Sequence, residues 1–223
     1  MEAMEISTNP DFEHSVNPDD LEWVVFTKGE TEEPFESWLQ RNLPSAVSKE
    51  AGFGWVCIRR EPLQGWADEP DLGGLYDSWE QFLSSGRPVT YQNIRELALN
   101  HNVKSGKWLF FADSGGKVDH LWTIVARAVI NNTLPCNSAK VSTYDGSNRH
   151  VICIYNNDFN DKEQVLSAEQ AIRNMGIKSK MLYKPDVYTC LNIYRKNKWG
   201  LPANIMHSNY DLLRGSSVIE SGV

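Results

Sequence analysis

The chain has few of the residues that build metal sites or disulfide scaffolds. Of its 223 residues, four are cysteine and five are histidine. The cysteines are widely spaced, with no C-x-x-C pair, and no two histidines stand four residues apart. This spacing lacks the patterns of zinc sites and of small disulfide-rich domains. We therefore expect no metal, no cofactor and free thiols, in a reducing cytosolic or nuclear location.

Long apolar runs are also absent. No run approaches the ~20 residues that a membrane-spanning helix needs, and the N-terminus is acidic and polar, unlike a secretory signal. We expect no membrane partner. The hydrophobic fraction of 41% and the aromatic fraction of 11% are typical of a globular protein, and this length fits one domain with a substantial core.

Catalytic motifs are missing as well. His120 follows Asp119 at the start of a predicted helix and could act as a general base, but a capping or structural role is commoner for such a residue. The SGGK sequence at 114–117 lacks the full spacing of a phosphate-binding loop and is interpreted as a turn. We expect no catalytic residues and favour a binding protein. An enzyme whose motifs are not recognisable is the third alternative.

Charge is distributed unevenly along the chain. The net charge is −7, yet residues 1–37 hold eleven Asp or Glu against one Lys, and residues 178–198 hold six basic residues against one acid. Residues 1–20 also contain two Asn-Pro dipeptides and are predicted to be a flexible acidic arm. The charges could serve solubility alone. The alternative is that the basic stretch binds an anionic partner, with which the arm competes.

Hydrophobic periodicity predicts one domain over residues 21–213, followed by a flexible tail over residues 214–223. The predicted strands are 21–27, 53–59, 107–112, 139–143, 150–155, 177–183 and 187–194. The predicted helices are 33–42, 76–84, 90–100, 117–132 and 161–176, with Thr90 and Asp161 as N-caps and Gly176 as a C-terminal stop.

The order of these elements is not a strict alternation of strand and helix. It predicts an α+β fold in which helices pack on one face of a curved, mostly antiparallel sheet. The other face is then left to form a concave site or to be covered by loops. The clean helical period of residues 118–130 and the capped helix at 161–176 should lie on the same face of the sheet.

Aromatic and basic residues are interleaved near the end of the predicted domain. Such a mixture could stack the bases and bind the phosphates of single-stranded nucleic acid. The alternative is a core tyrosine beside a lysine-rich strand edge that prevents sheet-to-sheet association. Trp66, in a polar loop, is a further candidate for an exposed stacking ring. The residues of the basic stretch are Tyr188, Tyr194, Arg195, Lys196, Lys198 and Trp199.

Several short sequence motifs resemble those of known protein families. From about Asp77 to Ile177 the order of elements resembles the 4E class of cap-binding translation initiation factors, with DSWEQF similar to the first dorsal helix and GKWLFF to a G-[RK]-W-L strand. A closer resemblance, from Trp23 to about Tyr194, is to the basophilic leukaemia expressed protein family, through SGRPVT, SGKWL, VICIY and YKPDVYT. These resemblances imply a fold like that of translation initiation factor 4E and assign no activity.

The 4E resemblance also implies roles for particular residues. Trp79 takes the place of a tryptophan that faces partner proteins. The cap-binding factors hold a methylated guanine between two tryptophans and bind its edge with a Trp-Glu pair, and no such pair occurs here between Gly86 and Lys107. Where cap phosphates would bind, only Arg149 and His150 are basic. Our hypothesis is a protein that binds RNA or a nucleotide-like ligand without ordinary cap recognition. The alternative is a protein-interaction adaptor that uses the helical face around Trp79.

Overall fold

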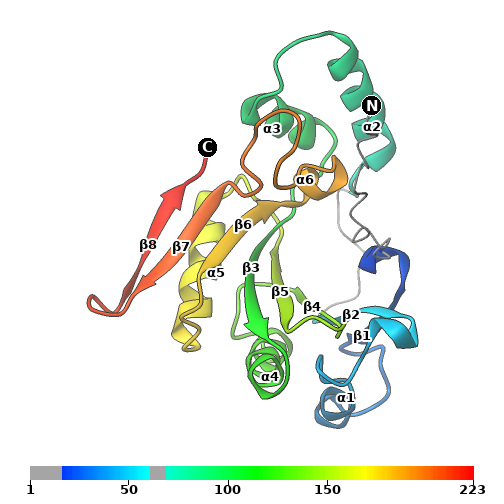
Figure 1. Ribbon diagram of the computed structural model, residues 1–223, viewed down its shortest axis with the longest axis vertical. Helices are drawn as coiled ribbons and strands as arrows, with labels where there is room; N and C mark the ends of the chain where they lie inside the picture. Colours follow the sequence, from blue (N-terminus) through cyan, green and yellow to red (C-terminus); the bar gives the residue numbers. More distant parts are fainter. Residues whose placement is uncertain (1–16, 61–68) are drawn as a thin grey trace, which may run out of the picture.

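A computed structural model describes residues 17–60 and 69–223. In this part of the chain, eight strands form one sheet in the order β1-β2-β4-β5-β3-β6-β7-β8 (Figure 1). β1 (Glu22–Thr27) and β2 (Phe53–Arg59) are parallel, and all other neighbouring strands are antiparallel. The predicted α+β fold with a mostly antiparallel sheet is therefore confirmed. The other strands are β3 (Gly106–Asp113), β4 (Ser138–Ser142), β5 (Arg149–Asn156), β6 (Met181–Pro185), β7 (Met206–Asp211) and β8 (Ser216–Ser221).

Six α-helices and two short 3₁₀ turns precede or connect the strands in the described part of the chain. They are α1 (Phe35–Arg41), α2 (Leu72–Ser84), α3 (Tyr91–Asn100), α4 (Gly116–Ile130), α5 (Lys162–Asn174) and α6 (Asp186–Cys190), with single 3₁₀ turns η1 (Pro18–Asp20) and η2 (Lys49–Ala51). α2, α3 and α6 gather beyond one end of the central strands, at the top of Figure 1. No helix in the described part of the chain is both long enough and apolar enough to span a membrane.

Alternate side chains of the central strand β3 identify the two faces of the sheet. Trp108, Phe110 and Ala112 are buried on one face, and the indole Nε1 of Trp108 donates a hydrogen bond to the carbonyl oxygen of Val165 in α5 at 2.9 Å. Successive strand residues point to opposite faces. Lys107, Leu109 and Phe111 must therefore lie on the other face, which we call the open face.

Helices α4 and α5 both pack on the face that carries Trp108. Trp122 and Val125 of α4 and Ile172 of α5 are fully buried in one core cluster with Phe110. α4 contacts β2, β3 and β4, and α5 contacts β5. The predicted placement of these two helices on the same face is confirmed.

Local signals in the sequence fix the ends of these helices. The side chain of Asp161 accepts a hydrogen bond from the backbone N–H of Gln164 at 3.0 Å, as an N-cap should. Oε1 of Gln164 does not return to the cap; it accepts from the N–H groups of Asn157 and Asp158 and thereby orders the turn before α5. Gly176 follows α5 with a φ of +85°, a conformation that favours glycine.

Two predictions about the C-terminal third are wrong. Residues 187–194 were predicted as a strand, but residues 186–190 form helix α6, which starts directly after Pro185. Val, Tyr and Thr have strand propensity, but tertiary packing overrides it here: Val187 and Tyr188 both pack into the core cluster from this helix. The tail predicted to be flexible from residue 214 instead contains β8, which pairs with β7.

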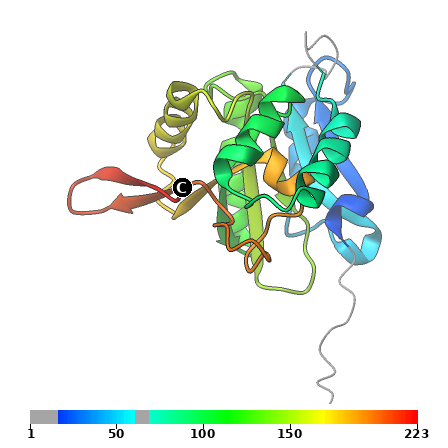
Figure 2. The ribbon, with the colours of Figure 1, turned by 90° about the horizontal axis from the view of Figure 1, so that it is seen from above.

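A buried arginine explains why the C-terminal hairpin is ordered. The guanidinium of Arg173 in α5 donates to Oε1 of Glu169 at 2.9 Å and to the hydroxyls of Ser208 and Ser217 at 2.7 and 3.0 Å. Ser208 lies in β7 and Ser217 in β8, so one side chain connects the helix to both strands. Beyond this contact the hairpin projects away from the body of the molecule (Figure 2).

We predict that Trp122→Ala lowers the free energy of unfolding by about 3–5 kcal/mol, because it removes a large ring from the core. Trp122 is fully buried, and among the described residues its Nε1 has no hydrogen-bond partner. Trp122→Phe should cost clearly less, since it keeps a ring and removes an unpartnered N–H. Urea denaturation of both variants measures the difference. A loss below about 1 kcal/mol for the alanine variant would contradict the core role.

Candidate functional site

The register of the sheet brings residues from five strands together on the open face. One row across the sheet runs from Cys57 through Lys140, Cys153 and Leu109 to Leu182. The neighbouring row contains Tyr155, Lys107 and Lys184, which lie side by side on β5, β3 and β6. Because these positions alternate with the buried core residues, the strands that build the core also place three lysines on one surface.

A cavity of about 340 Å³ lies over this surface. Its floor is formed by the open face, one wall by Asp19 of η1, and another by the segment that follows α6. A volume of this size suits a small ligand or a single nucleotide unit. The residues that line it are Asp19, Trp55, Lys107, Leu109, Phe111, Lys140, Val151, Cys153, Leu182, Lys184, Thr189, Tyr194, Arg195, Ala203 and Asn204.

Lys140 joins the aromatic corner of the cavity to the N-terminal segment. Its ammonium lies 3.8 Å from the ring centroid of Trp55 and 4.3 Å from that of Trp23. It also forms an ion pair with Asp19, with Nζ and Oδ1 3.2 Å apart. Gly54 makes this approach possible, since a Cβ at that position would lie 1.9 Å from the carbonyl oxygen of Pro18.

Lys107 has its own anion. Its buried ammonium donates to Oδ1 of Asp186 and, at 3.1 Å, to the hydroxyl of Thr189. The other carboxylate oxygen of Asp186 accepts from the hydroxyl of Ser105 at 2.6 Å. Burial alone would lower the pKa of Lys107, but the charge and hydrogen bond of Asp186 outweigh it and hold the pKa above its ordinary value. Lys107 is thus a fixed cation.

Lys184 differs from the other two lysines. The residue is 5% exposed, and its ammonium makes no hydrogen bond or ion pair with any described residue. The ammonium instead lies over the ring of Tyr194 in a cation–π contact, with Nζ 3.6 Å from the ring centroid. Burial and the neighbouring charge of Lys107 lower the pKa of Lys184 to about 8, against the opposing effect of Asp186.

Of the predicted ligand-binding residues, the structure places two in the cavity and one at its border. Tyr194 and Arg195 line it. Arg149 is exposed on β5, with its guanidinium 4.4 Å from the ring centroid of Phe111, so it extends the same surface. These three residues come from two segments, strand β5 and the loop after α6, which the fold brings together.

Two of the predicted ligand contacts are wrong. Tyr188 is fully buried within the helical end of the core and is not on the open face. His150 is also buried, with Nδ1 2.7 Å from the carbonyl oxygen of Ser142 and Nε2 3.1 Å from the hydroxyl of Ser114. Both imidazole nitrogens are therefore used to hold the end of the sheet. Trp66 lies outside the described residues.

The rest of the basic stretch points elsewhere. Lys196 is exposed in a turn with a φ of +63°, and Lys198 lies 5.1 Å from the ring centroid of Trp199. Trp199 packs edge-on against Trp79, with the ring centroids 5.1 Å apart. Lys198 and Trp199 thus belong with α2 and are not among the residues that line the cavity.

Trp79 is placed differently from the expected partner-facing residue. It is 7% exposed, stacked on Phe82 and covered by Trp199. The expectation of a surface ring at this position is wrong. The exposed apolar side chains of α2 are Leu72 and Tyr76, at 42% and 44%. They stand one helical turn apart and so share a side of the helix.

The three lysines were not predicted as site residues, whereas Tyr194, the ring beside Lys184, was. Lys107, Lys140 and Lys184 each interrupt a strand of otherwise strong core pattern, at a position that alternates with buried apolar residues. The sequence therefore contained a signal: in each of these three strands, a lysine occupies a position that alternates with the core residues. The strand order needed to group them, however, comes only from the tertiary structure.

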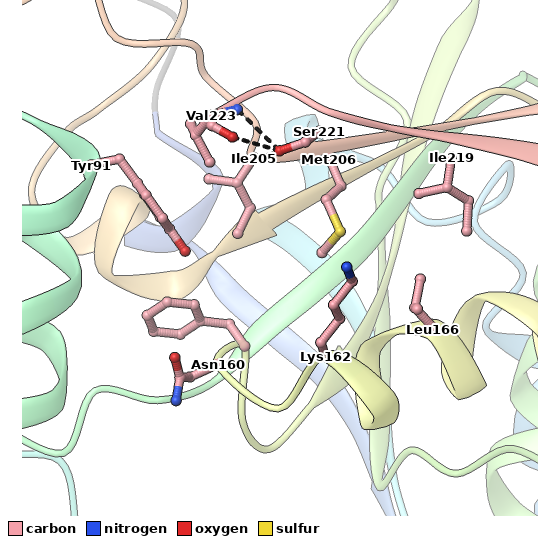
Figure 3. A pocket seen from close by; sticks show the side chains of 10 residues that line it. Tyr91, Asn160, Lys162, Leu166, Ile205, Met206, Ile219, Ser221 and Val223 are labelled. Carbon is pink, nitrogen blue, oxygen red and sulfur yellow. Dashed lines mark hydrogen bonds between the residues drawn. The ribbon is translucent and has the colours of Figure 1, made fainter.

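A second cavity, of about 580 Å³, lies between α3, α5 and the base of the C-terminal hairpin (Figure 3). Tyr91 and Lys162 point into it beside Met206 and Ile205. It is larger than the open-face cavity, but Lys162 is the one cation among its lining residues. The open face, with three lysines and an arginine, is the stronger candidate for an anionic ligand.

A Ser-His-Asp arrangement occurs at the junction of α2 and α3. Nε2 of His101 is 2.8 Å from the hydroxyl of Ser78, and Nδ1 is 3.0 Å from Oδ2 of Asp71. Ser78 lies in the middle of α2, where the helix itself uses the backbone N–H groups. No N–H is then free there to stabilise an oxyanion. We interpret these bonds as a connection between two helices. The described residues contain no group of three or more His, Cys, Asp or Glu able to hold a metal ion.

Comparison with known families gives one match over half of the chain. The sequence model of a family described as basophilic leukemia-expressed protein Bles03 matches residues 78–192. The matched region runs from α2 through α6 and includes β3, β4, β5 and β6. It therefore covers the central strands that carry Lys107, Lys140 and Lys184.

Solved structures similar to the chain include complexes of eIF4E. Schistosome eIF4E with m7GpppA and 4E-BP is 17% identical, the match covering 43% of this chain and 55% of that one, with a TM-score of 0.36. Ascaris suum eIF4E-3 with m7G cap is 20% identical; the match covers 38% of this chain and 52% of that one, with a TM-score of 0.34. C. elegans eIF4E-3 with the 4E-binding protein Mextli and cap analog is 17% identical; the match covers 40% of this chain and 55% of that one, with a TM-score of 0.36. The chain thus spans about half the length of these proteins, and TM-scores this low carry no argument about its site.

We predict that Asp186→Asn lowers the free energy of unfolding by about 3 kcal/mol, because it leaves the buried charge of Lys107 without its anion. The double variant Lys107→Met/Asp186→Asn should recover part of that loss, since neither charge then remains. Chemical denaturation of the single and double variants measures both effects. A double variant as unstable as the sum of the two single variants would show that the ion pair is not coupled.

Proposed function

We propose that this chain, which belongs to the Bles03 family as its sequence predicted, binds an anionic ligand with a flat ring on its open face. Family membership assigns no ligand, so the proposal rests on the open face. The ligand class is a nucleotide, free or as part of single-stranded RNA. The observation that carries the proposal is the group of Lys140, Lys184 and Arg195 around an apolar cavity with aromatic walls.

The chemistry of the cavity fits the two parts of a nucleotide. The rings of Trp55, Phe111 and Tyr194 border an apolar floor on which a base can stack, and stacking on aromatic side chains tolerates any base. Lysine and arginine at the border supply the charge that a phosphate needs. Lys107 contributes little to this, because Asp186 already neutralises it.

The aromatic corner does not resemble an open slot for a methylated guanine. The rings of Trp23 and Trp55 are tilted by 56° with centroids 6.3 Å apart. The ammonium of Lys140 lies within reach of both. A base would have to displace this cation before it could enter between them. This supports the proposal of nucleotide binding without ordinary cap recognition.

Asp19 stands where the ligand's anion would bind. Its carboxylate lines the cavity and forms an ion pair with Lys140, so the end of the acidic N-terminal segment occupies one of the site's cations. A ligand phosphate must compete with this carboxylate. We therefore include in the proposal that Asp19 weakens binding. The sequence suggested such competition at the basic stretch of residues 178–198, whereas Asp19 pairs with Lys140 of β4.

We predict that the full chain binds a short single-stranded RNA with an affinity that falls as salt rises, by about 0.7 in log K per log unit of salt for each phosphate neutralised. Lys140→Met should flatten this slope by about 0.7 if Lys140 contacts a phosphate. Fluorescence anisotropy at several salt concentrations gives the slope. Lys180→Met, which removes an exposed lysine outside the cavity, is the matched control and should leave it less affected.

The direction in which one further substitution changes the affinity distinguishes binding at the open face from non-specific electrostatic attraction. Asp19→Asn should strengthen binding of RNA and of GMP. Asp20→Asn removes the same charge from an exposed neighbour that does not pair with Lys140, and should have a smaller effect. A methylated cap analogue should gain little over GMP. Equal effects at both aspartates, or no RNA binding at low salt, would reject the open-face site.

A specific observation favours a second candidate function, binding of a partner protein. Leu72 and Tyr76 are exposed on α2, the helix whose buried Trp79 packs edge-on against Trp199. Exposed apolar side chains one turn apart on a helix are typical of a small docking surface. This candidate moves the predicted partner contact from Trp79 to the surface of the same helix.

We predict that, if the adaptor function holds, partners captured on the immobilised protein persist after nuclease treatment and are lost with Leu72→Ser/Tyr76→Ser. Both side chains are exposed, so the double variant should keep its stability, as circular dichroism can verify. Partners that disappear with nuclease and bind this variant normally would favour the RNA function. Lys140→Met serves here as the control that leaves α2 unchanged.

A further inference from the structure

Lys184 combines three features that rarely occur together in a lysine with only a structural role. It is buried, it lines an accessible cavity, and no described carboxylate pairs with it. The carboxylate of Asp186, two residues along the chain, is already bonded to the ammonium of Lys107 and the hydroxyl of Ser105. Lys184 is therefore the amine in this cavity whose charge is least well compensated.

The groups that face Lys184 come from every element around it. On β3 it meets the ammonium of Lys107, and on α6 the carboxylate of Asp186; the loop after α6 supplies the ring of Tyr194 and the guanidinium of Arg195. Cys153 and Tyr155 of β5 have pKa values raised by burial, so both are neutral near pH 7. Lys140 and Asp19 complete the wall as an ion pair.

We propose that Lys184 is a nucleophilic amine that forms an imine with a small aldehyde carrying an anionic group. A desolvated lysine beside a second ammonium is a known means of producing a neutral amine near neutral pH. The lowered pKa of Lys184, about 8, agrees with this geometry. Arg195 and the lysines would attract the anionic group, and the apolar floor would hold the body of the molecule. The inference goes beyond nucleotide binding and does not require it.

The step balances without a further reagent. The neutral amine of Lys184 attacks the carbonyl carbon, a C–N bond forms, and a proton moves to the oxygen to give a carbinolamine. Loss of water then gives the imine, and hydrolysis reverses the reaction. Added borohydride delivers a hydride to the imine carbon, water supplies a proton to the nitrogen, and a stable secondary amine remains.

The test is competitive labelling of the full chain with pyridoxal 5′-phosphate at one equivalent, trapped with borohydride and mapped by peptide mass spectrometry. Roughly a quarter of an amine with a pKa of about 8 is neutral at pH 7.5, against about one in a thousand for an ordinary lysine. Lys184 should be labelled at least about tenfold faster than the exposed Lys180 in the same molecule. Its rate should level off above pH 8, while that of Lys180 continues to rise.

Two variants keep the test decisive. Lys184→Arg retains the charge and removes the reactive amine, so it should abolish the fast labelling while the protein stays folded by circular dichroism. Lys107→Met should slow labelling at pH 7.5, because it removes a like charge and frees Asp186, and both changes raise the pKa of Lys184. Labelling of Lys184 no faster than Lys180 in the unaltered chain would overturn the inference.

The result of the labelling experiment does not depend on whether the proposed nucleotide binding is correct. Rapid labelling of Lys184 in ligand-free protein supports the inference whether or not RNA binds. Failure of GMP to protect Lys184 would count against nucleotide binding at the open face and would leave the amine's reactivity unaffected. Conversely, salt-dependent RNA binding with slow labelling would support the proposed function and reject the reactive lysine.

Discussion

The alternation of side chains along β3 is the constraint on which the rest of the structure depends. Trp108, Phe110 and Ala112 must be buried beneath α4 and α5, and the hydrogen bond from Trp108 to α5 fixes the register of helix on sheet. A shift of one residue would reverse both faces. The burial of this core therefore also forces Lys107, Leu109 and Phe111 onto the open face, so packing and the composition of the candidate site share one cause.

Buried charge on the open face is handled differently at each lysine. Lys107 has the carboxylate of Asp186, and Lys140 has Asp19 together with two indole rings, whereas Lys184 has an aromatic ring and no described anion. An ammonium taken out of water without an anion is destabilised, and neutralisation of the amine relieves that cost. Both proposals, an anion-binding cavity and a reactive amine, rest on this uneven pairing of the three lysines.

The segment between α6 and β7 connects two surfaces that are otherwise separate. Tyr194, Arg195 and Asn204 form a wall of the open-face cavity, while Trp199, between them in sequence, covers Trp79 on α2. Asn197 stabilises this loop, donating from its side-chain amide to the carbonyl oxygens of Tyr194 and Leu201 at 2.8 and 2.7 Å. One loop therefore contacts both the open-face cavity and α2.

The sequence by itself determined the elements with local signals: the helices capped by Thr90 and Asp161, the hairpin of β4 and β5, and the alternating core of β3, because periodicity and caps act over a few residues. It also determined the family. Only the tertiary structure decided that residues 186–190 are helical, that Arg173 orders the C-terminal hairpin, and that three lysines from three strands meet. These features depend on partners distant in sequence, because strand order and the contacts between elements are set only in the folded chain.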